Sequence, residues 1–213
     1  MTTYSGLEFY SKPLFHVVLL IAYSVLSKKI KPLFYLFYLS AMTVEFMDKS
    51  TIVFSMLWVI LGYSICFISG VVLLFPLLKK GKLRLIGINR LFALIVIASL
   101  GYIILSTYIT FLSELNTSLF FAFGILPFTA FLVSCFYITS VYSHSKSIYL
   151  FLTGIGYSIT CLLGLIVLAL QVKNVMLFGF INLSTTVAQF CFVFFMIDFE
   201  EILKHKNITA FEV

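Results

Sequence analysis

Glu45 is the acidic residue of this chain that falls within a long apolar run, where a carboxyl group can deliver or accept a proton. An ionised carboxylate in hydrocarbon costs about 2.5–3.5 kcal/mol on insertion scales, so an acid inside a membrane segment is a candidate functional residue by default. A structural interpretation stays open beside this one. Lys49 follows one helical turn later, and the two side chains would then form an ion pair at the water interface.

A second candidate is a polar stripe near the carboxyl end of the chain. Asn182, Thr185, Thr186 and Gln189 are spaced at helical intervals and would share one helix face. Amide groups in lipid need hydrogen-bond partners, so we expect this face to point into a helix bundle. The stripe would then either join helices, at roughly 0.6 kcal/mol per hydrogen bond, or bind a substrate oxygen. Tyr157, deep in another apolar run, is a further candidate; the predicted substrate-binding residues are Tyr157, Asn182 and Gln189.

Other residue types give no sign of a metal site or a cofactor. His16, His144 and His205 lie on separate predicted elements, and we expect them at the membrane interface. The four cysteines lie in four different apolar runs: Cys66, Cys135, Cys161 and Cys191. None has the spacing of a metal ligand or of a redox pair, so we expect small buried side chains. No nucleotide-binding loop, nucleophile elbow, zinc-protease motif or haem motif is present, and we expect neither a metal nor a cofactor.

The elements that must position these residues are apolar runs. The chain of 213 residues is 62% hydrophobic and only 10% charged, against about a quarter charged in ordinary soluble domains. The runs are Leu14–Leu26, Pro32–Met47, Thr51–Leu78, Leu91–Leu112, Leu119–Tyr142, Ile148–Leu170 and Val175–Ile197. A transmembrane helix needs about 20 apolar residues, so the first two runs require flanking residues at the interface. Continuous rather than alternating runs predict an all-α bundle of seven transmembrane helices, in one domain over residues 1–213.

The distribution of basic residues predicts the orientation of this bundle. If all seven runs cross the membrane, most basic residues share one side: Lys28, Lys29, Lys31, Lys79, Lys80, Lys82, Arg84, Arg90, Lys146, Lys204 and Lys206. Only Lys12, Lys49 and Lys173 lie on the other. Basic residues gather in cytoplasmic loops, so we expect a multi-pass cell-membrane protein, of a bacterial inner membrane, with the amino terminus outside and the carboxyl terminus in the cytoplasm. The net charge of +6 then indicates lipid headgroups as partners rather than nucleic acid.

Two further patterns bear on how the helices begin and pack. Pro13 and Pro32 each follow a lysine, and proline is favoured in the first turn of a helix. Gly156, Thr160 and Gly164 recur at four-residue intervals, which predicts a close approach between two helices.

The order of these features resembles the YhhN-like lysoplasmalogenase family of small helical membrane proteins. The similar parts are Lys12-Pro13-Leu14, the segment Ser40–Met47, the glycine-bearing sixth helix, and Ala188-Gln189-Phe190 in the last helix. The family usually has Gly-Asp where this chain has Val44-Glu45. It also has a second aspartate in the sixth helix, where this chain has Ser158 or Thr160, which cannot ionise.

The resemblance implies hydrolysis of the vinyl-ether bond of a lysoplasmalogen, a lysophospholipid substrate. That reaction needs a proton delivered to the alkene and water added to the resulting cation, and a buried carboxylic acid is a plausible donor. Glu45 would be this catalytic acid. Because the second carboxylate is missing, a catalytically inactive lipid-binding or interaction protein is an alternative. A small-solute carrier is a third, and lacks mid-span basic residues or aspartates for ion coupling. The sequence leaves the oligomeric state open.

Overall fold

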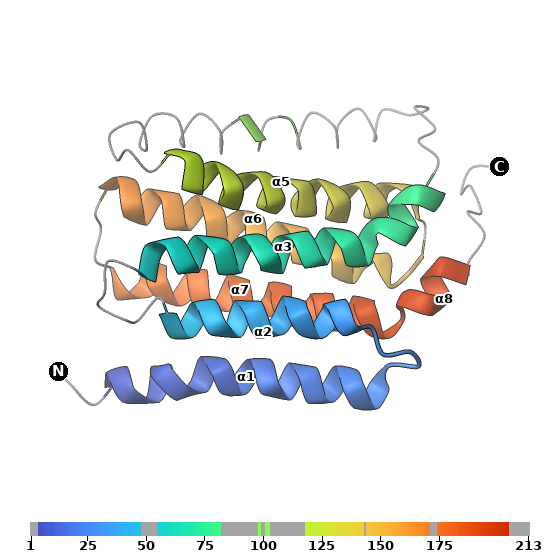
Figure 1. Cartoon of the computed structure of the whole chain (residues 1–213), viewed down its shortest axis with the longest axis horizontal. Coiled ribbons are helices and arrows are strands. Elements are labelled where there is room, and N and C mark those ends of the chain that lie inside the picture. Colours follow the sequence, from blue (N-terminus) through green and yellow to red (C-terminus); the bar gives the residue numbers. More distant parts are fainter. Residues whose placement is uncertain are drawn as a thin grey trace. The chain divides into compact units, whose positions relative to one another are not determined.

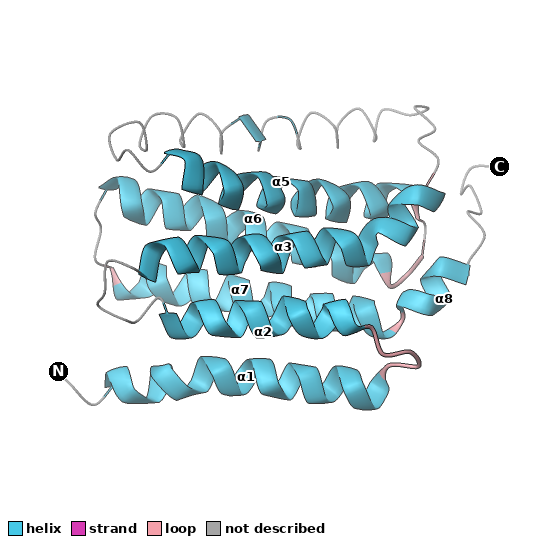
Figure 2. Ribbon diagram, viewed as in Figure 1, coloured by secondary structure: helices cyan, strands magenta, loops and turns pink. Residues whose placement is uncertain are grey.

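The computed structural model describes residues 4–47, 55–81, 98, 101–102, 118–142, 144–170 and 174–204. These residues are almost entirely helical, and no strand occurs among them (Figure 2). The helices are α1 (Tyr4–Leu26), α2 (Pro32–Met47), α3 (Ser55–Lys80), α5 (Ser118–Val141), α6 (Ser147–Leu170), α7 (Val175–Ile197) and the short α8 (Phe199–Lys204) (Figure 1). The predicted all-α class is therefore confirmed for the part of the chain that the structure describes.

Most predicted boundaries agree closely with the observed helices, with one clear exception. Helices α2 and α7 begin and end where the apolar runs do, and Pro32 opens α2 as expected. The prediction that Pro13 opens the first helix is wrong, because α1 already begins at Tyr4. Hydropathy marks only the apolar part of a helix, and the polar residues before Pro13 are also helical.

Four helical segments are long and apolar enough to cross a membrane, by length and composition. They are Trp58–Lys80, Gly124–Val141, Ser147–Gly164 and Val175–Ile197. Helix α1 contributes a shorter apolar stretch, Leu14–Leu26, and α2 has 16 residues. The run Leu91–Leu112 lies outside the described residues except for 98 and 101–102. These apolar helices are characteristic of a membrane protein, while the number of crossings and the orientation stay predictions.

The chain divides into two compact units, which are described separately below. Unit 1 comprises Met1–Phe75 and Leu119–Phe131, and unit 2 comprises Pro76–Ser118 and Leu132–Val213. Helices α3 and α5 each contribute residues to both units, so the division does not follow helix ends. The expected single domain over residues 1–213 stays a prediction.

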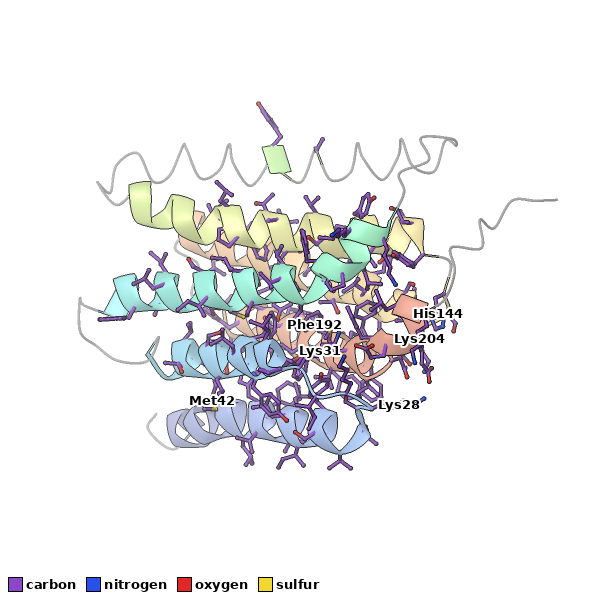
Figure 3. The ribbon with its side chains drawn as sticks, turned by 45° about the vertical axis from the view of Figure 1, so that its right-hand side comes forward. Lys28, Lys31, Met42, His144, Phe192 and Lys204 are labelled. Carbon is purple, nitrogen blue, oxygen red and sulfur yellow. The ribbon has the colours of Figure 1, made fainter. Side chains whose placement is uncertain are left out.

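Unit 1 contains a helical hairpin, in which α1 and α2 lie side by side and are joined by the turn at residues 27–31 (Figure 1). The Tyr23 ring stacks on Phe34 with 3.8 Å between centroids. The Tyr23 hydroxyl also donates to the Lys29 carbonyl and accepts from the Lys31 amide, both at 3.2 Å. Lys28 and Lys31 lie at this turn, and Met42 lies toward the other end of α2 (Figure 3). One tyrosine thus fastens the turn to the helices that it connects.

Unit 2 has a densely connected end, where α3 finishes and α6 and α8 begin. Tyr142 donates its hydroxyl to the Leu77 carbonyl at 3.0 Å, and Lys80 Nζ donates to the Leu203 carbonyl at 3.2 Å. Lys146 forms an ion pair with Asp198 at 3.2 Å. His144 and Lys204 lie at this end of the unit (Figure 3). At this end of unit 2, Lys80 and Lys146 therefore connect helix ends to one another.

Candidate functional site

Helix α1 places a histidine on its buried face. His16, Leu19 and Tyr23 are spaced at helical intervals and are all buried, whereas Val18 and Ile21 on the other side of the helix are exposed. The exposed aliphatic face suits lipid, so the imidazole points into unit 1. His16 is 0% exposed, so its imidazole is enclosed by the protein.

Helix α2 supplies the acid that meets this histidine. Phe34, Phe37, Tyr38, Ala41 and Val44 form the buried face of α2. Glu45 follows Val44 at the border of that face, and its side chain is 16% exposed. The helix register therefore directs the carboxyl group toward α1 rather than out into lipid.

The two side chains meet across the hairpin. His16 Nε2 and Glu45 Oε2 are 3.0 Å apart, which is an ion-pair distance. The same two atoms do not meet the angular requirements of a hydrogen bond, and neither has another hydrogen-bond partner among the described residues. His16 Nδ1 is likewise buried without a hydrogen-bond partner.

The surroundings of the pair are mostly aromatic and aliphatic. The Tyr38 ring meets the His16 ring edge-on, with centroids 5.8 Å apart. From α3, the buried Cys66 side chain lies near Ser40 and Glu45. Charges interact more strongly in such a low-dielectric environment, and burying an unpaired charge there is costly. The arrangement can therefore hold, donate or accept one proton inside the helical hairpin.

The structure shows what surrounds His16, His144 and Glu45. His16, which was predicted at the membrane interface, is enclosed by the protein within α1; its depth in the membrane stays a prediction. His144 is partly exposed, and its Nδ1 accepts from the Lys146 amide. The alternative partner of Glu45, Lys49, lies outside the described residues, as does His205. Glu45 instead meets a partner on a neighbouring helix.

The predicted substrate-binding residues all lie in unit 2, and two of the three are buried. Tyr157 is 6% exposed and Gln189 is 4% exposed, whereas Asn182 is partly exposed. Glu45 belongs to unit 1. Because each unit is described by itself, a common lining made by Glu45, Tyr157 and Gln189 stays a prediction.

The polar stripe of α7 only partly faces its neighbour. Thr185 Oγ1 is 3.0 Å from Thr160 Oγ1 on α6, so this position joins two helices as expected. Thr186 is exposed and donates to the carbonyl of Asn182 in its own helix. The prediction that the whole stripe points inward is therefore wrong at Thr186.

The predicted small-residue contact of α6 is confirmed at Gly156 and Thr160. A Cβ atom added at Gly156 would lie 2.8 Å from Ala188 Cβ, and the Ser184 hydroxyl donates to the Gly156 carbonyl at 2.8 Å. A Cβ added at Gly164 would meet no neighbouring helix within 4 Å among the described residues, so the pattern ends there. This helix contact gives a structural role to two of the polar residues that the sequence singled out in unit 2, Thr160 and Thr185.

No group of three or more His, Cys, Asp or Glu side chains that could hold a metal ion occurs in the described part of the chain. The candidate site is thus the pair formed by His16 and Glu45. No family model, no curated protein and no solved structure matches this chain.

Proposed function

We propose that this chain is an integral membrane hydrolase of the lysoplasmalogenase type, which crosses the membrane seven times with its amino terminus outside and its carboxyl terminus in the cytoplasm. The topology is supported by the apolar helices and by the lysines at the turn between α1 and α2 and at the end of α3. Its partners are membrane lipids, and its substrate is a single-chain lysophospholipid with a vinyl-ether bond.

The observation that carries this proposal is the His16–Glu45 pair. Cleavage of a vinyl ether begins with the transfer of a proton to the alkene, so the enzyme needs an acid in an apolar site where the lipid chain can lie. Glu45 is a carboxyl group beside a buried imidazole at 3.0 Å, bordered by Tyr38 and Val44. An acid positioned in this way typically contributes 10²–10⁴-fold to the rate.

The test is to incubate the purified protein in detergent with a lysoplasmalogen and to measure the release of the fatty aldehyde. We expect Glu45→Gln, which keeps the shape of the side chain but cannot donate the proton, to lower kcat by about 10²-fold or more. Glu201→Gln on the exposed side of α8 is the matched control and should retain the wild-type rate. A wild-type protein that releases no aldehyde, or a fully active Glu45→Gln variant, contradicts the proposal.

A proton-coupled solute carrier is the second candidate, because of one specific observation. Buried histidine and acidic pairs are the groups that membrane transporters use to bind protons, and the His16–Glu45 pair supplies such groups. For the carrier, an inward proton gradient across proteoliposomes should drive solute uptake, and Glu45→Gln should uncouple uptake from that gradient. Aldehyde release without uptake favours the hydrolase.

A further inference from the structure

We infer that His16 is a second catalytic residue of the proposed reaction: its Nδ1 takes a proton from the attacking water, and its Nε2 returns a proton to Glu45. This inference rests on the proposed function. It deepens that function by assigning the step for which the sequence offers no second carboxylate.

The first support is the unpartnered ring nitrogen. Histidine Nδ1 and Nε2 are both hydrogen-bonding atoms, and the large majority of buried side-chain polar atoms in proteins have a partner. Leaving one unsatisfied costs about 1–3 kcal/mol. His16 is 0% exposed, and no described residue forms a hydrogen bond with its Nδ1. In the inferred reaction, this nitrogen is the atom to which the attacking water donates.

The second support is the position of the opposite ring nitrogen. Nε2 lies 3.0 Å from Glu45 Oε2, so a proton bound at Nδ1 can be balanced by the loss of another from Nε2. The groups that face the pair are Tyr38 of α2, edge-on to the ring, and Cys66 of α3, near Glu45. Neither carries a basic nitrogen, so among these groups the imidazole is the one with a ring nitrogen that can accept the proton of the water.

The proton count closes over the reaction. The carboxyl proton of Glu45 adds to the outer alkene carbon, which leaves an oxocarbenium ion and a carboxylate. Water then forms a bond to the cationic carbon and gives one proton to His16 Nδ1, while the Nε2 proton passes to Glu45. The resulting hemiacetal collapses, with its hydroxyl proton lost and the leaving glycerol oxygen protonated. The products are an aldehyde and the glycerophospho-base, and one water molecule is consumed.

The deciding experiment uses heavy water to separate the two steps. In His16→Gln, the side-chain amide of glutamine reaches the position of His16 Nε2 beside Glu45. Glutamine has no atom at the position of Nδ1, so nothing accepts the proton of the water. We expect kcat to fall by about 10²-fold with little change in KM. Glu45 should still protonate the alkene, and the stalled cation should lose a proton again. Lysoplasmalogen recovered from heavy water should therefore carry deuterium at the outer vinyl carbon, whereas with Glu45→Gln it should carry none.

The outcomes distinguish this inference from the proposed function. His144→Gln, in unit 2, is the matched control and should hydrolyse the substrate at the wild-type rate. If His16→Gln keeps kcat within threefold of wild type, or loses both hydrolysis and deuterium exchange while folded, His16 is not the base and only the inference fails. A wild-type protein without aldehyde release removes the proposed function and the inference together. If His16→Gln does not purify as a monodisperse protein, the same measurements are made on His16→Phe, which keeps an aromatic ring against Tyr38.

Discussion

The contact between α6 and α7 is built from glycine, alanine and hydroxyl side chains, whereas the contact between α1 and α2 is built mainly from aromatic rings, with one hydroxyl pair (Ser24 and Tyr35) and the His16–Glu45 pair. In the first, Thr153 donates to the Ala188 carbonyl and Ser184 to the Gly156 carbonyl. In the second, the ring nitrogens of His16 and one oxygen of Glu45 have no hydrogen-bond partner among the described residues.

The difference separates polar groups that join helices from polar groups that are kept ready to react. A hydroxyl that donates to a helix carbonyl has its hydrogen-bond partner within the protein, so burying it between helices costs little free energy. Ionisable groups with unused bonding capacity lower the stability of the folded state. A natural protein that retains such a cost in its interior is expected to use it. The α1–α2 contact is therefore the part of this molecule to probe for chemistry.

The largest effect is expected from removing one member of the ion pair. Glu45→Leu leaves His16 buried without its partner, and should lower the free energy of unfolding by about 3 kcal/mol. The double variant His16→Phe with Glu45→Leu replaces the whole pair by apolar side chains and should recover most of that loss. Unfolding in mixed micelles with increasing dodecyl sulfate measures both. A double variant as unstable as the single one would mean that the pair is structural.

A smaller effect is expected from enlarging the closest point between α6 and α7. In Gly156→Leu, the new Cβ alone would lie 2.8 Å from Ala188 Cβ and 2.9 Å from the Ser184 carbonyl oxygen, and the rest of the side chain needs still more space. The overpacking should cost about 2 kcal/mol in the same unfolding assay. Gly164→Leu is the matched control in the same helix, with no atom within 4 Å, and should shift stability by less than about 1 kcal/mol. Equal losses at the two glycines would show that helix packing is not the cause.

The smallest effect is expected from the hydroxyl pair between α6 and α7. A double-mutant cycle of Thr160→Val and Thr185→Val should give a coupling energy of about 0.6 kcal/mol, as interhelical hydrogen bonds in membranes do. Pairing Thr160→Val with Thr186→Val should give no coupling, because Thr186 bonds only within its own helix. A coupling well above 1 kcal/mol at Thr160 and Thr185 would weaken the contrast between the two helix contacts.

Helix ends were predictable where local residues determine them. Helix α2 begins at a proline that follows a lysine, and α7 is preceded by Asn174, whose side-chain oxygen accepts from the Met176 amide at 2.9 Å. The start of α1 was missed because its first turns are polar, and hydropathy reports burial in lipid rather than helix formation. The sequence pattern therefore located the apolar part of each helix better than the helix itself.

The partner of Glu45 could not be predicted from local spacing. His16 is far away in sequence and is surrounded by aliphatic residues, so no local motif connects the two. One signal was nevertheless present: His16 and Glu45 lie at similar distances on either side of the turn at residues 27–31, and a short turn makes neighbouring helices antiparallel. Which atoms meet, and that His16 Nδ1 is left unpartnered, depend on side-chain packing across the hairpin.

The Tyr23 hydroxyl, which bonds to the backbone at Lys29 and Lys31, also bears on how the chain is made. Closing so short a turn costs little chain entropy, so α1 and α2 can pair as soon as both have left the ribosome. In the proposed topology, His16 and Glu45 would then enter the lipid already in contact, and the translocon would not have to release an isolated acidic side chain into the bilayer.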